Sequence, residues 1–219
     1  MSEKFAVIFD MDGVLIDSNP FHKKSLNIFA EKYGHHLSDE ELRLKVYGRP
    51  NKDWISRLFE KQLNKDQLFT YGEEKEAIFR DIYSHHIKPV NGLMKFLDRL
   101  RSLEIEMAIA TSAPRSNIDF LFEHIDIKSY FPVVLDESDV SRGKPDPEVY
   151  LKAAERLGYS PDRCIVFEDS LSGVESAYSA GCKVVGVRTT HQEDEFKNVV
   201  LTVDDFDDTH LIELRNLLF

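Results

Sequence analysis

The stretch that most constrains the fold lies near the start of the chain, where five apolar residues at positions 5–9 precede Asp10 and Asp12. A short apolar run that ends at charged residues and a glycine predicts a buried strand opening onto a loop, although periodicity by itself also permits a buried helical turn. Polar groups after such a strand lie at the carboxyl edge of a sheet, where open α/β sheets bind ligands. The two aspartates are therefore the first candidate site residues.

Composition limits the classes of protein to which the chain can belong. With 219 residues, 42% of them hydrophobic, the chain can bury a full core and carry a smaller second module. Its net charge of −11 repels a phosphate backbone, so we expect no nucleic-acid partner. No apolar run approaches the ~20 residues that span a bilayer, and the start MSEKF lacks the apolar stretch of a signal peptide. We expect a cytoplasmic monomer with no membrane partner.

Residues 17–88 are predicted to form an all-helical module. Asn19 and Pro20 provide an N-cap residue and a proline at the first helical position, and Gly34 ends the first helix. A capping box at residues 38–41 opens the second helix, and Pro50 can open the third. A fourth helix is expected over about residues 66–83. The buried stripe of the third helix is expected to comprise Trp54, Ile55, Leu58, Phe59 and Leu63.

After about residue 89, apolar segments alternate with amphipathic stretches. The expected strands cover residues 106–111, 132–135, 164–168, 183–187 and 199–203, and the expected helices cover 92–103, 115–124, 147–157 and 171–180. This alternation predicts a parallel sheet with helices on both faces, because parallel strands need crossover connections. We expect a doubly wound (Rossmann-like) α/β core domain, residues 1–16 and 89–219, with an inserted helical cap domain, residues 17–88. We expect the two linkers between these domains, near residues 16–19 and 88–92, to form a hinge.

Polar residues at the ends of the predicted strands, and in one loop between them, complete a candidate site. In chain order they are Asp10, Asp12, Thr111, Ser112, Lys144, Glu168 and Asp169. A doubly wound sheet brings them to one edge. Hydroxyls and backbone N–H groups at a helix start can hold phosphate, and the lysine adds a positive charge. Clustered carboxylates suit Mg²⁺, which one or two carboxylates usually bind together with substrate and waters. The set predicts phosphoryl transfer to an aspartate.

Four ordered segments resemble the motifs of a known family. They are FDMDGVLIDS, the Thr111-Ser112 pair, GKPDPEVY and FEDSLSGVESAYSAG. Together they resemble the four motifs of the haloacid dehalogenase superfamily of aspartate-nucleophile phosphotransferases. A helical insert directly after the first motif is similar to the subgroup that includes β-phosphoglucomutase and many small sugar-phosphate phosphatases. The resemblance covers essentially the whole chain, strongly in the core and weakly in the cap.

The resemblance implies a role for each matched residue. Asp10 would be the nucleophile that forms an aspartyl-phosphate, and Asp12 would be the general acid and base. Mg²⁺ would be bound by the carboxylates of Asp10 and Asp169 and by the backbone carbonyl of Asp12. The cation and Lys144 would offset the repulsion between a carboxylate and an anionic phosphate. The residues that would bind the substrate's phosphate are Thr111, Ser112 and Lys144.

The cap offers weaker candidates. His22 lies on the first predicted cap helix, where the β-phosphoglucomutase-like enzymes also place a histidine, so it is a candidate substrate-binding residue. A histidine on the amphipathic face of the helix is an equally good interpretation. The residues that could recognise the substrate beyond its phosphate are Arg49, Asn51, Lys52 and Lys75.

We expect a Mg²⁺-dependent phosphatase that acts on a small phosphorylated metabolite, a sugar phosphate. The alternative is a β-phosphoglucomutase-like hexose-phosphate mutase. In the mutases an arginine is expected three residues after the glycine that ends the second cap helix; here that position is Asn51, and Arg49 directly follows the glycine. Dehalogenases of the superfamily lack the second aspartate of the first motif, so Asp12 argues against that branch. A pyrophosphatase and a noncatalytic phosphate-binding regulator remain further alternatives.

Several residues also have structural interpretations. Asp146-Pro147 fits the N-cap and first residue of a helix better than a catalytic pair. Glu168 fits a carboxylate that orients Lys144 or a metal-bound water, so it stays outside the predicted ligand set. Cys164 and Cys182 form no CxxC motif and lie in or beside apolar runs. We expect both to be buried, reduced thiols.

Overall fold

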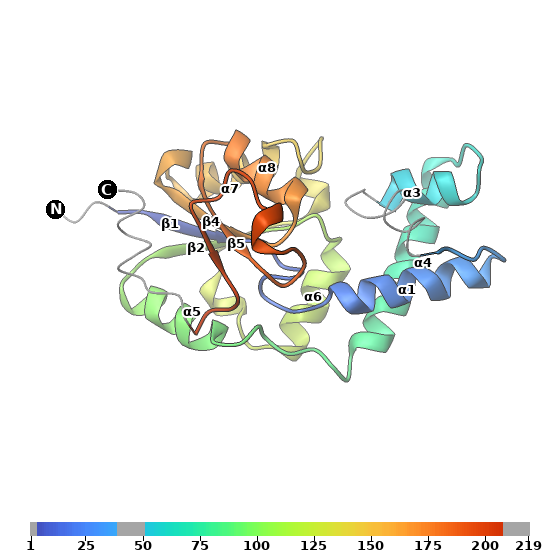
Figure 1. The fold of residues 1–219 in the computed structure, drawn as a ribbon, viewed down its shortest axis with the longest axis horizontal. Coiled ribbons are helices and arrows are strands. Elements are labelled where there is room, and N and C mark those ends of the chain that lie inside the picture. The colour runs from blue at the N-terminus through green and yellow to red at the C-terminus, as the bar shows by residue number, and fades with distance from the viewer. Residues whose placement is uncertain (1–3, 39–50, 208–219) are drawn as a thin grey trace. The chain divides into compact units, whose positions relative to one another are not determined.

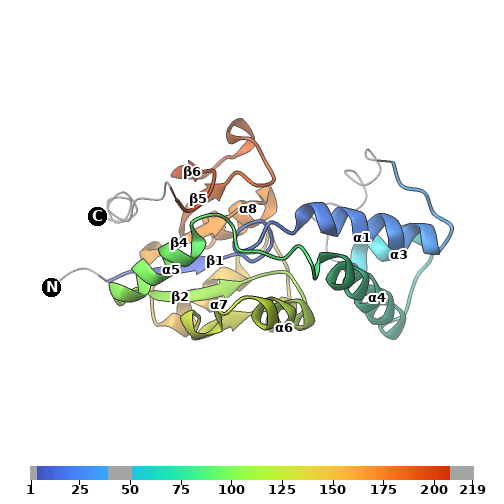
Figure 2. The same ribbon diagram turned by 90° about the horizontal axis from the view of Figure 1, so that it is seen from below.

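The structure is a computed structural model that describes residues 4–38 and 51–207, without the side chains of residues 51–53. The chain divides into two compact units, residues 1–17 with 88–219 and residues 18–87. Figure 1 and Figure 2 show both units as ribbons. That these units act as a catalytic core and a cap stays a prediction.

The first unit contains a six-stranded parallel sheet with the strand order β3-β2-β1-β4-β5-β6. The strands are β1 Ala6–Phe9, β2 Glu106–Ala110, β3 Val133–Leu135, β4 Cys164–Glu168, β5 Lys183–Val187 and β6 Leu201–Val203. The helices are α5 Leu93–Ser102, α6 Arg115–His124, α7 Glu148–Leu157 and α8 Leu171–Ser179. Short 3₁₀ turns lie at Lys128–Tyr130, Glu137–Asp139, Pro161–Arg163 and Glu193–Glu195. The predicted α/β class with a doubly wound parallel sheet is confirmed.

The sheet is covered on both faces, with α7 and α8 on one side and α5 and α6 on the other (Figure 1). All four residues of β1 are fully buried, as expected for a central parallel strand between two helical layers. This double burial explains why the strand is a continuous apolar run rather than an alternating one.

The two faces of the sheet have different cores. Phe9 belongs to an aromatic core on the α5 side, with ring centroids 5.3 Å from Phe167 and 6.2 Å from Phe96. Ala6 and Ile8 point to the opposite face and join an aliphatic cluster with α7 and α8. Because successive side chains of a strand alternate between faces, the residue after Phe9 continues the face of Ile8.

The second unit contains α1 Asn19–Lys32, α3 Asn51–Leu58 and α4 Lys65–Tyr83. Its core includes Leu26, Phe29 and Ala30 of α1 and Trp54, Ile55 and Leu58 of α3. The last two residues of the predicted stripe, Phe59 and Leu63, follow α3 and are only partly buried. The expected cap at Asn19 is wrong: Asn19 is the first helical residue, and Ser18 precedes the helix without a side-chain cap. The α4 helix begins with a capping box between Asn64 and Gln67. The second predicted helix, and the start of the third at Pro50, lie outside the described residues.

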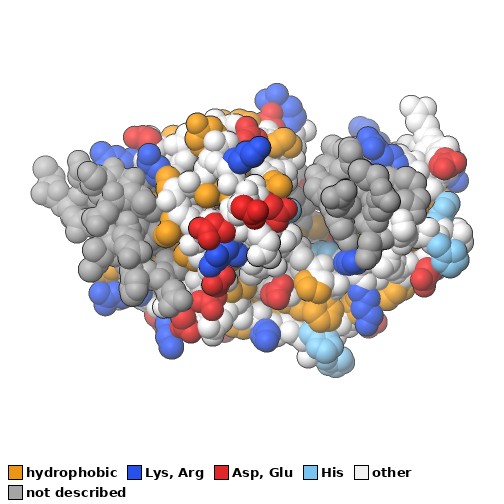
Figure 3. All heavy atoms as spheres, viewed as in Figure 1, with side chains coloured by type: hydrophobic (Ala, Val, Ile, Leu, Met, Phe, Trp, Pro, Cys, Tyr) orange, Lys and Arg blue, Asp and Glu red, His pale blue; other side chains and the backbone are white. Residues whose placement is uncertain are grey.

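The described helices do not include one that is both long and apolar enough to cross a membrane. On the face drawn in Figure 3, acidic and basic side chains are interspersed and form no broad basic patch among the described residues. The expected absence of a nucleic-acid partner stays a prediction. The cytoplasmic location and the monomeric state stay predictions.

Candidate active site

The first motif and β4 present two carboxylates side by side. In the parallel pairing of β1 and β4, Phe9 lies beside Phe167, and the Asp10 N–H donates to the Phe167 carbonyl at 3.0 Å. The residues after Phe9 and Phe167 are Asp10 and Glu168. Their side chains lie on the same face of the sheet as Ile8 and Val166, the face that packs on α7 and α8. Strand register therefore brings the predicted nucleophile next to the last residue of β4.

Lys144 connects the ends of three strands. Its Nζ lies 2.6 Å from Oδ1 of Asp10 and 2.6 Å from Oε1 of Glu168, and it donates to the Ala110 carbonyl at 3.2 Å. The lysine side chain is only 6% exposed. The loop before α7 thus reaches the same sheet edge as β1, β2 and β4, as the topology predicts, and Lys144 is not a surface lysine.

Glu168 is fully buried, and each of its oxygens accepts hydrogen bonds. The Tyr150 hydroxyl donates to Oε1 at 2.9 Å, and the Ser170 N–H and hydroxyl donate to Oε2 at 2.9 and 3.0 Å. A Cβ at Gly173 would overlap the Glu168 carboxylate, so this position in α8 requires glycine. The predicted orienting role for Glu168 toward Lys144 is consistent with these contacts. We did not identify Tyr150 from the sequence, although it lies six residues after Lys144 on the buried face of α7.

The segment after β5 also reaches the site. Thr190 donates a hydrogen bond from its hydroxyl to Oδ2 of Asp169, and the Thr189 hydroxyl donates to the Gly13 carbonyl at 2.5 Å. Asp169 is buried, with 3% exposure. Neither threonine belongs to the predicted site, although both follow a parallel strand whose carboxyl end lies at the same edge.

The remaining predicted core residues lie at this edge with varying burial. Asp12 is half-buried and forms a β-bridge with Ile16 in the loop after β1. The Thr111 N–H donates to the Leu135 carbonyl at 3.1 Å, and its hydroxyl accepts from the Ala113 N–H at 3.1 Å. Ser112 is exposed. The helix that follows, α6, begins at Arg115, as predicted, three residues after Ser112.

The side chain of Asp146 accepts a hydrogen bond from the Glu148 N–H at 3.1 Å. The helix α7 begins at Glu148, so Pro147 is its N-cap position and not its first residue.

Cys164 and Cys182 are buried and free, as expected, and burial raises the pKa of the Cys164 thiol to about 12. A thiol with such a pKa is a poor nucleophile at neutral pH.

Burial and charge perturb the ionisation of the cluster. Burial raises the pKa of Asp10 to about 7, although the neighbouring Lys144 acts to lower it. Burial and the charges of Glu168 and Asp10 raise the pKa of Asp169 well above its usual value, although Thr190 and Lys144 oppose this shift. Burial acts to lower the pKa of Lys144, but the two carboxylates that it contacts raise it overall. Ionisation of the full carboxylate set is therefore costly in the protein alone.

The cluster has the composition of a divalent-cation site. Ligand atoms of Asp10, Glu168 and Asp169 lie within 4.8 Å of one another. Three carboxylates and one lysine have a formal charge of −3 + 1 = −2. A cation of charge +2 would neutralise this surplus, and buried oxygen ligands suit Mg²⁺. The residues present therefore fit this ion.

In the helical unit, His22 stacks on Phe79, with ring centroids 3.7 Å apart. Its Nδ1 lies 2.8 Å from Nζ of Lys75, which also donates to Oε1 of Glu76 at 2.9 Å. Lys75 and Glu76 are buried. The proposed roles of His22 and Lys75 toward a substrate stay predictions. The other cap candidates lie outside the described residues: Arg49, and the side chains of Asn51 and Lys52.

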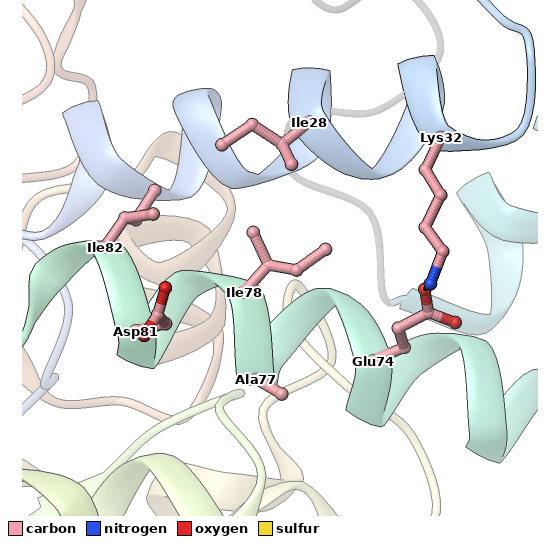
Figure 4. A pocket seen from close by; sticks show the side chains of 7 residues that line it. All are labelled: Ile28, Lys32, Glu74, Ala77, Ile78, Asp81 and Ile82. Atoms are coloured by element: carbon pink, nitrogen blue, oxygen red, sulfur yellow. Dashed lines mark hydrogen bonds and ion pairs between the residues drawn. The ribbon is translucent and has the colours of Figure 1, made fainter.

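A cavity of about 510 Å³ opens between α1 and α4, entirely within the helical unit. Figure 4 shows its apolar side chains and the Lys32–Glu74 ion pair at one end. The lining residues are Ile28, Lys32, Glu74, Ala77, Ile78, Asp81 and Ile82. None of these residues belongs to the cluster of buried carboxylates, so this cavity is separate from the candidate active site.

Comparison with known proteins assigns the family. A family model for haloacid dehalogenase-like hydrolases matches residues 7–187. A phosphorylated carbohydrates phosphatase from Thermotoga maritima is 37% identical over 183 residues, which cover 83% of this chain and 84% of that protein. The crystal structure of a haloacid dehalogenase hydrolase of family IA, variant 3, from Entamoeba histolytica is 31% identical, with a TM-score of 0.91 over 98% of this chain and 99% of that one.

A second solved structure, of a candidate β-phosphoglucomutase from Thermotoga maritima, is 35% identical, with a TM-score of 0.70 over 91% of this chain and 94% of that one. The resemblance inferred from the four sequence motifs is thereby confirmed. The chain belongs to the haloacid dehalogenase-like hydrolases and is a phosphatase of the β-phosphoglucomutase-like subgroup.

Proposed function

We propose that the protein is a Mg²⁺-dependent phosphatase that hydrolyses a small phosphorylated carbohydrate through an aspartyl-phosphate on Asp10. The observation that carries this proposal is the bridge by Lys144 between Asp10 and Glu168, buried beside Asp169. The substrate class is supported by the name of the Thermotoga maritima relative, which acts on phosphorylated carbohydrates.

Asp10 supplies the carboxylate oxygen that attacks phosphorus, which forms the aspartyl-phosphate and breaks the ester bond. Mg²⁺, bound by the carboxylates of Asp10 and Asp169 and the backbone carbonyl of Asp12, would supply positive charge that offsets the repulsion between carboxylate and phosphate. Lys144 adds a fixed positive charge, because its contacts with Asp10 and Glu168 keep it protonated.

Asp12 acts as the general acid and then as the general base. Its carboxyl group protonates the leaving oxygen of the ester, and its carboxylate then removes a proton from the water that hydrolyses the aspartyl-phosphate. Thr111 and the backbone of Ser112 hold the oxygens of phosphate that are not transferred. His22 is proposed as a further substrate-binding residue on the basis of the family resemblance.

A phosphate-release assay tests the proposal. Purified protein is incubated with a panel of sugar phosphates, other monoesters and pyrophosphate, with and without Mg²⁺. We expect Mg²⁺-dependent release that is highest with a sugar phosphate and that falls by about 10⁴-fold or more in Asp10→Asn. The matched control is Asp119→Asn, an exposed aspartate on α6. Near-normal turnover by Asp10→Asn would exclude this residue as the nucleophile.

A hexose-phosphate mutase is the second candidate function, and the similarity to the candidate β-phosphoglucomutase favours it. The two functions differ in their products. A hydrolase releases inorganic phosphate from a sugar monophosphate, whereas a mutase isomerises the sugar phosphate without net release. Isomerisation without release, followed by phosphorus NMR, would overturn the hydrolase proposal. Absence of any turnover despite phosphate binding would instead favour a noncatalytic regulator.

A further inference from the structure

We propose that Thr189 and Thr190, the threonine pair after β5, position the loops that bind the divalent cation and thereby set its affinity. The inference rests on the proposed Mg²⁺ site. Thr190 donates its hydroxyl hydrogen to Oδ2 of Asp169, and Thr189 donates to the Gly13 carbonyl at 2.5 Å. One dipeptide therefore contacts both the loop after β1 and the loop after β4.

The Thr189 contact acts on the backbone that carries the Asp12 carbonyl. That carbonyl shares a peptide plane with the Gly13 N–H, which donates to the Ile16 carbonyl at 2.7 Å. The Gly13 carbonyl on the following peptide is held by Thr189. Gly13 has φ of +77°, a conformation that glycine adopts readily. Hydrogen bonds on both sides of Gly13 therefore fix the orientation of the Asp12 carbonyl before a cation binds.

The Thr190 contact acts on a carboxylate directly. A hydrogen bond to one oxygen restricts rotation of the Asp169 carboxyl group. Threonine is suited to this role because its β-branched side chain has few rotamers. Neither hydroxyl is needed for a bond that forms or breaks, so both threonines are positioning residues. Loss of partners that orient metal ligands typically weakens metal affinity by about 10- to 100-fold.

The test compares Thr190→Val, which removes the donor, with Thr190→Ser, which keeps it. Thr70→Val is the control, because the Thr70 hydroxyl donates a hydrogen bond to the Asp66 carbonyl, at 2.8 Å, within the helical unit. Binding is measured without substrate, by electron paramagnetic resonance of free Mn²⁺ and by its displacement with Mg²⁺. We expect about tenfold weaker binding of both ions by Thr190→Val, and native affinity for the other two variants.

Thr189→Val is a second variant, which we expect to weaken binding of both ions by several-fold. The effect should be smaller because Thr189 contacts the Gly13 carbonyl, on the peptide next to the proposed ligand, the Asp12 carbonyl. At saturating Mg²⁺ both valine variants should retain most of the native kcat. Native Mn²⁺ affinity in a folded Thr190→Val, or an equal loss in Thr70→Val, would overturn the inference. If the native protein binds neither ion, both the proposed Mg²⁺ dependence and the inference fail, whereas binding that is insensitive to the threonines removes the inference alone.

Discussion

Each of the two units buries a lysine, and the partners of these lysines differ. Lys144, in the α/β unit, contacts two carboxylates, Asp10 and Glu168, both at 2.6 Å. Lys75, in the helical unit, contacts the carboxylate of Glu76 at 2.9 Å and Nδ1 of His22 at 2.8 Å. Both lysines are almost inaccessible to solvent.

The difference lies in the charge that remains after pairing. The pair of Lys75 and Glu76 is balanced by itself. The Lys144 cluster, with the nearby Asp169, retains a formal surplus of two negative charges. Since an uncompensated buried charge is costly, the first arrangement can serve structure alone, whereas the second must either bind protons or bind a cation. Buried charge thus indicates a functional site only where it is unbalanced.

Among the substitutions that compare the two units, the largest effect is expected for the leaving-group acid, Asp12. Asp12→Ala should slow hydrolysis of esters with poor leaving groups by about 10²- to 10⁴-fold, and of activated aryl phosphates much less. His22→Gln should slow both kinds of ester by a similar, smaller factor, because His22 is proposed to contact the substrate and not to protonate it. Steady-state kinetics with alkyl and aryl phosphates check this. If the loss depended on the leaving group in the His22 variant and not in the Asp12 variant, the general acid would be His22 and not Asp12.

Substitution of each lysine should destabilise its own unit. Lys144→Met and Lys75→Met each remove one member of a buried charge pair, a change that typically costs about 3–5 kcal/mol of unfolding free energy. Saturating Mg²⁺ should restore part of the loss in Lys144→Met and none in Lys75→Met, because only the first cluster has a surplus of carboxylates. Denaturant titrations followed by circular dichroism measure both. The single tryptophan, Trp54, reports on the helical unit by fluorescence.

Equal recovery of both variants with Mg²⁺ would show that the cation acts on overall stability and not on the Lys144 cluster. It would therefore remove the contrast between a balanced and an unbalanced pair.

The pH dependence of stability should also differ between the units. The pKa of Asp10 in the folded protein is raised to about 7, so the folded state holds this proton more tightly than the unfolded state. Without Mg²⁺, the contribution of Asp10 to the free energy of unfolding is greatest below about pH 4 and falls as the pH rises toward 7. The total loss is at most about 4 kcal/mol, at ~1.4 kcal/mol for each unit of pKa shift. Added Mg²⁺ should raise the free energy of unfolding by an amount that grows as the pH rises through the same range.

Glu74 in the helical unit should contribute with the opposite sign. Burial acts to raise its pKa, but hydrogen bonds from Lys32 and Tyr33 hold the pKa below its usual value, so its stabilisation is lost as pH falls. Thermal melts from about pH 2 to about pH 8, with and without Mg²⁺, measure the two trends, because the Glu74 contribution is lost mainly below about pH 4.5. Asp10→Asn should flatten the loss between pH 4 and pH 7, and an unchanged profile in that variant would contradict the assignment to Asp10.

The smallest effect is expected for two tyrosine–glutamate hydrogen bonds. The Tyr150 hydroxyl donates to Glu168 at 2.9 Å, and the Tyr33 hydroxyl donates to Glu74 at 2.7 Å. Tyr150→Phe should cost about 1.5–3 kcal/mol, the typical range for a bond to a charged group, and lower activity several-fold through Lys144. Tyr33→Phe, in a part-exposed pair, should cost less and leave activity unchanged. Equal effects on activity would assign both tyrosines to structure.

Much of the α/β fold could be predicted from sequence because its strands are buried on both faces. The apolar runs at 164–168 and 183–187 coincide with β4 and β5, and the amphipathic stretch at 115–124 coincides with α6. Helix starts were less predictable. The expected N-caps at Asn19 and Asp146 are each wrong by one residue, because side-chain and backbone bonding at a helix end depends on the path of the preceding loop.

Several site residues could also be identified from sequence, because the motifs that contain them follow strands whose ends share one edge. Asp10 and Lys144 are in contact, and Asp10 and Asp169 belong to one acidic cluster, although their chemical roles remain proposals. Tyr150 was missed because its contact with Glu168 depends on which face of α7 packs on the sheet. Thr189 and Thr190 were missed because hydroxyl residues after a strand are common and reveal no partner by themselves.

The sequence by itself determined which chemical groups follow the strands of a parallel sheet, and hence the α/β class and the family. Only the tertiary structure decided the charge state of those groups. Strand register places Asp10 beside Glu168, the loop before α7 inserts Lys144 between them, and burial raises the pKa of Asp10. Desolvation and Coulomb interactions depend on distance and burial, which the order of residues along the chain does not contain.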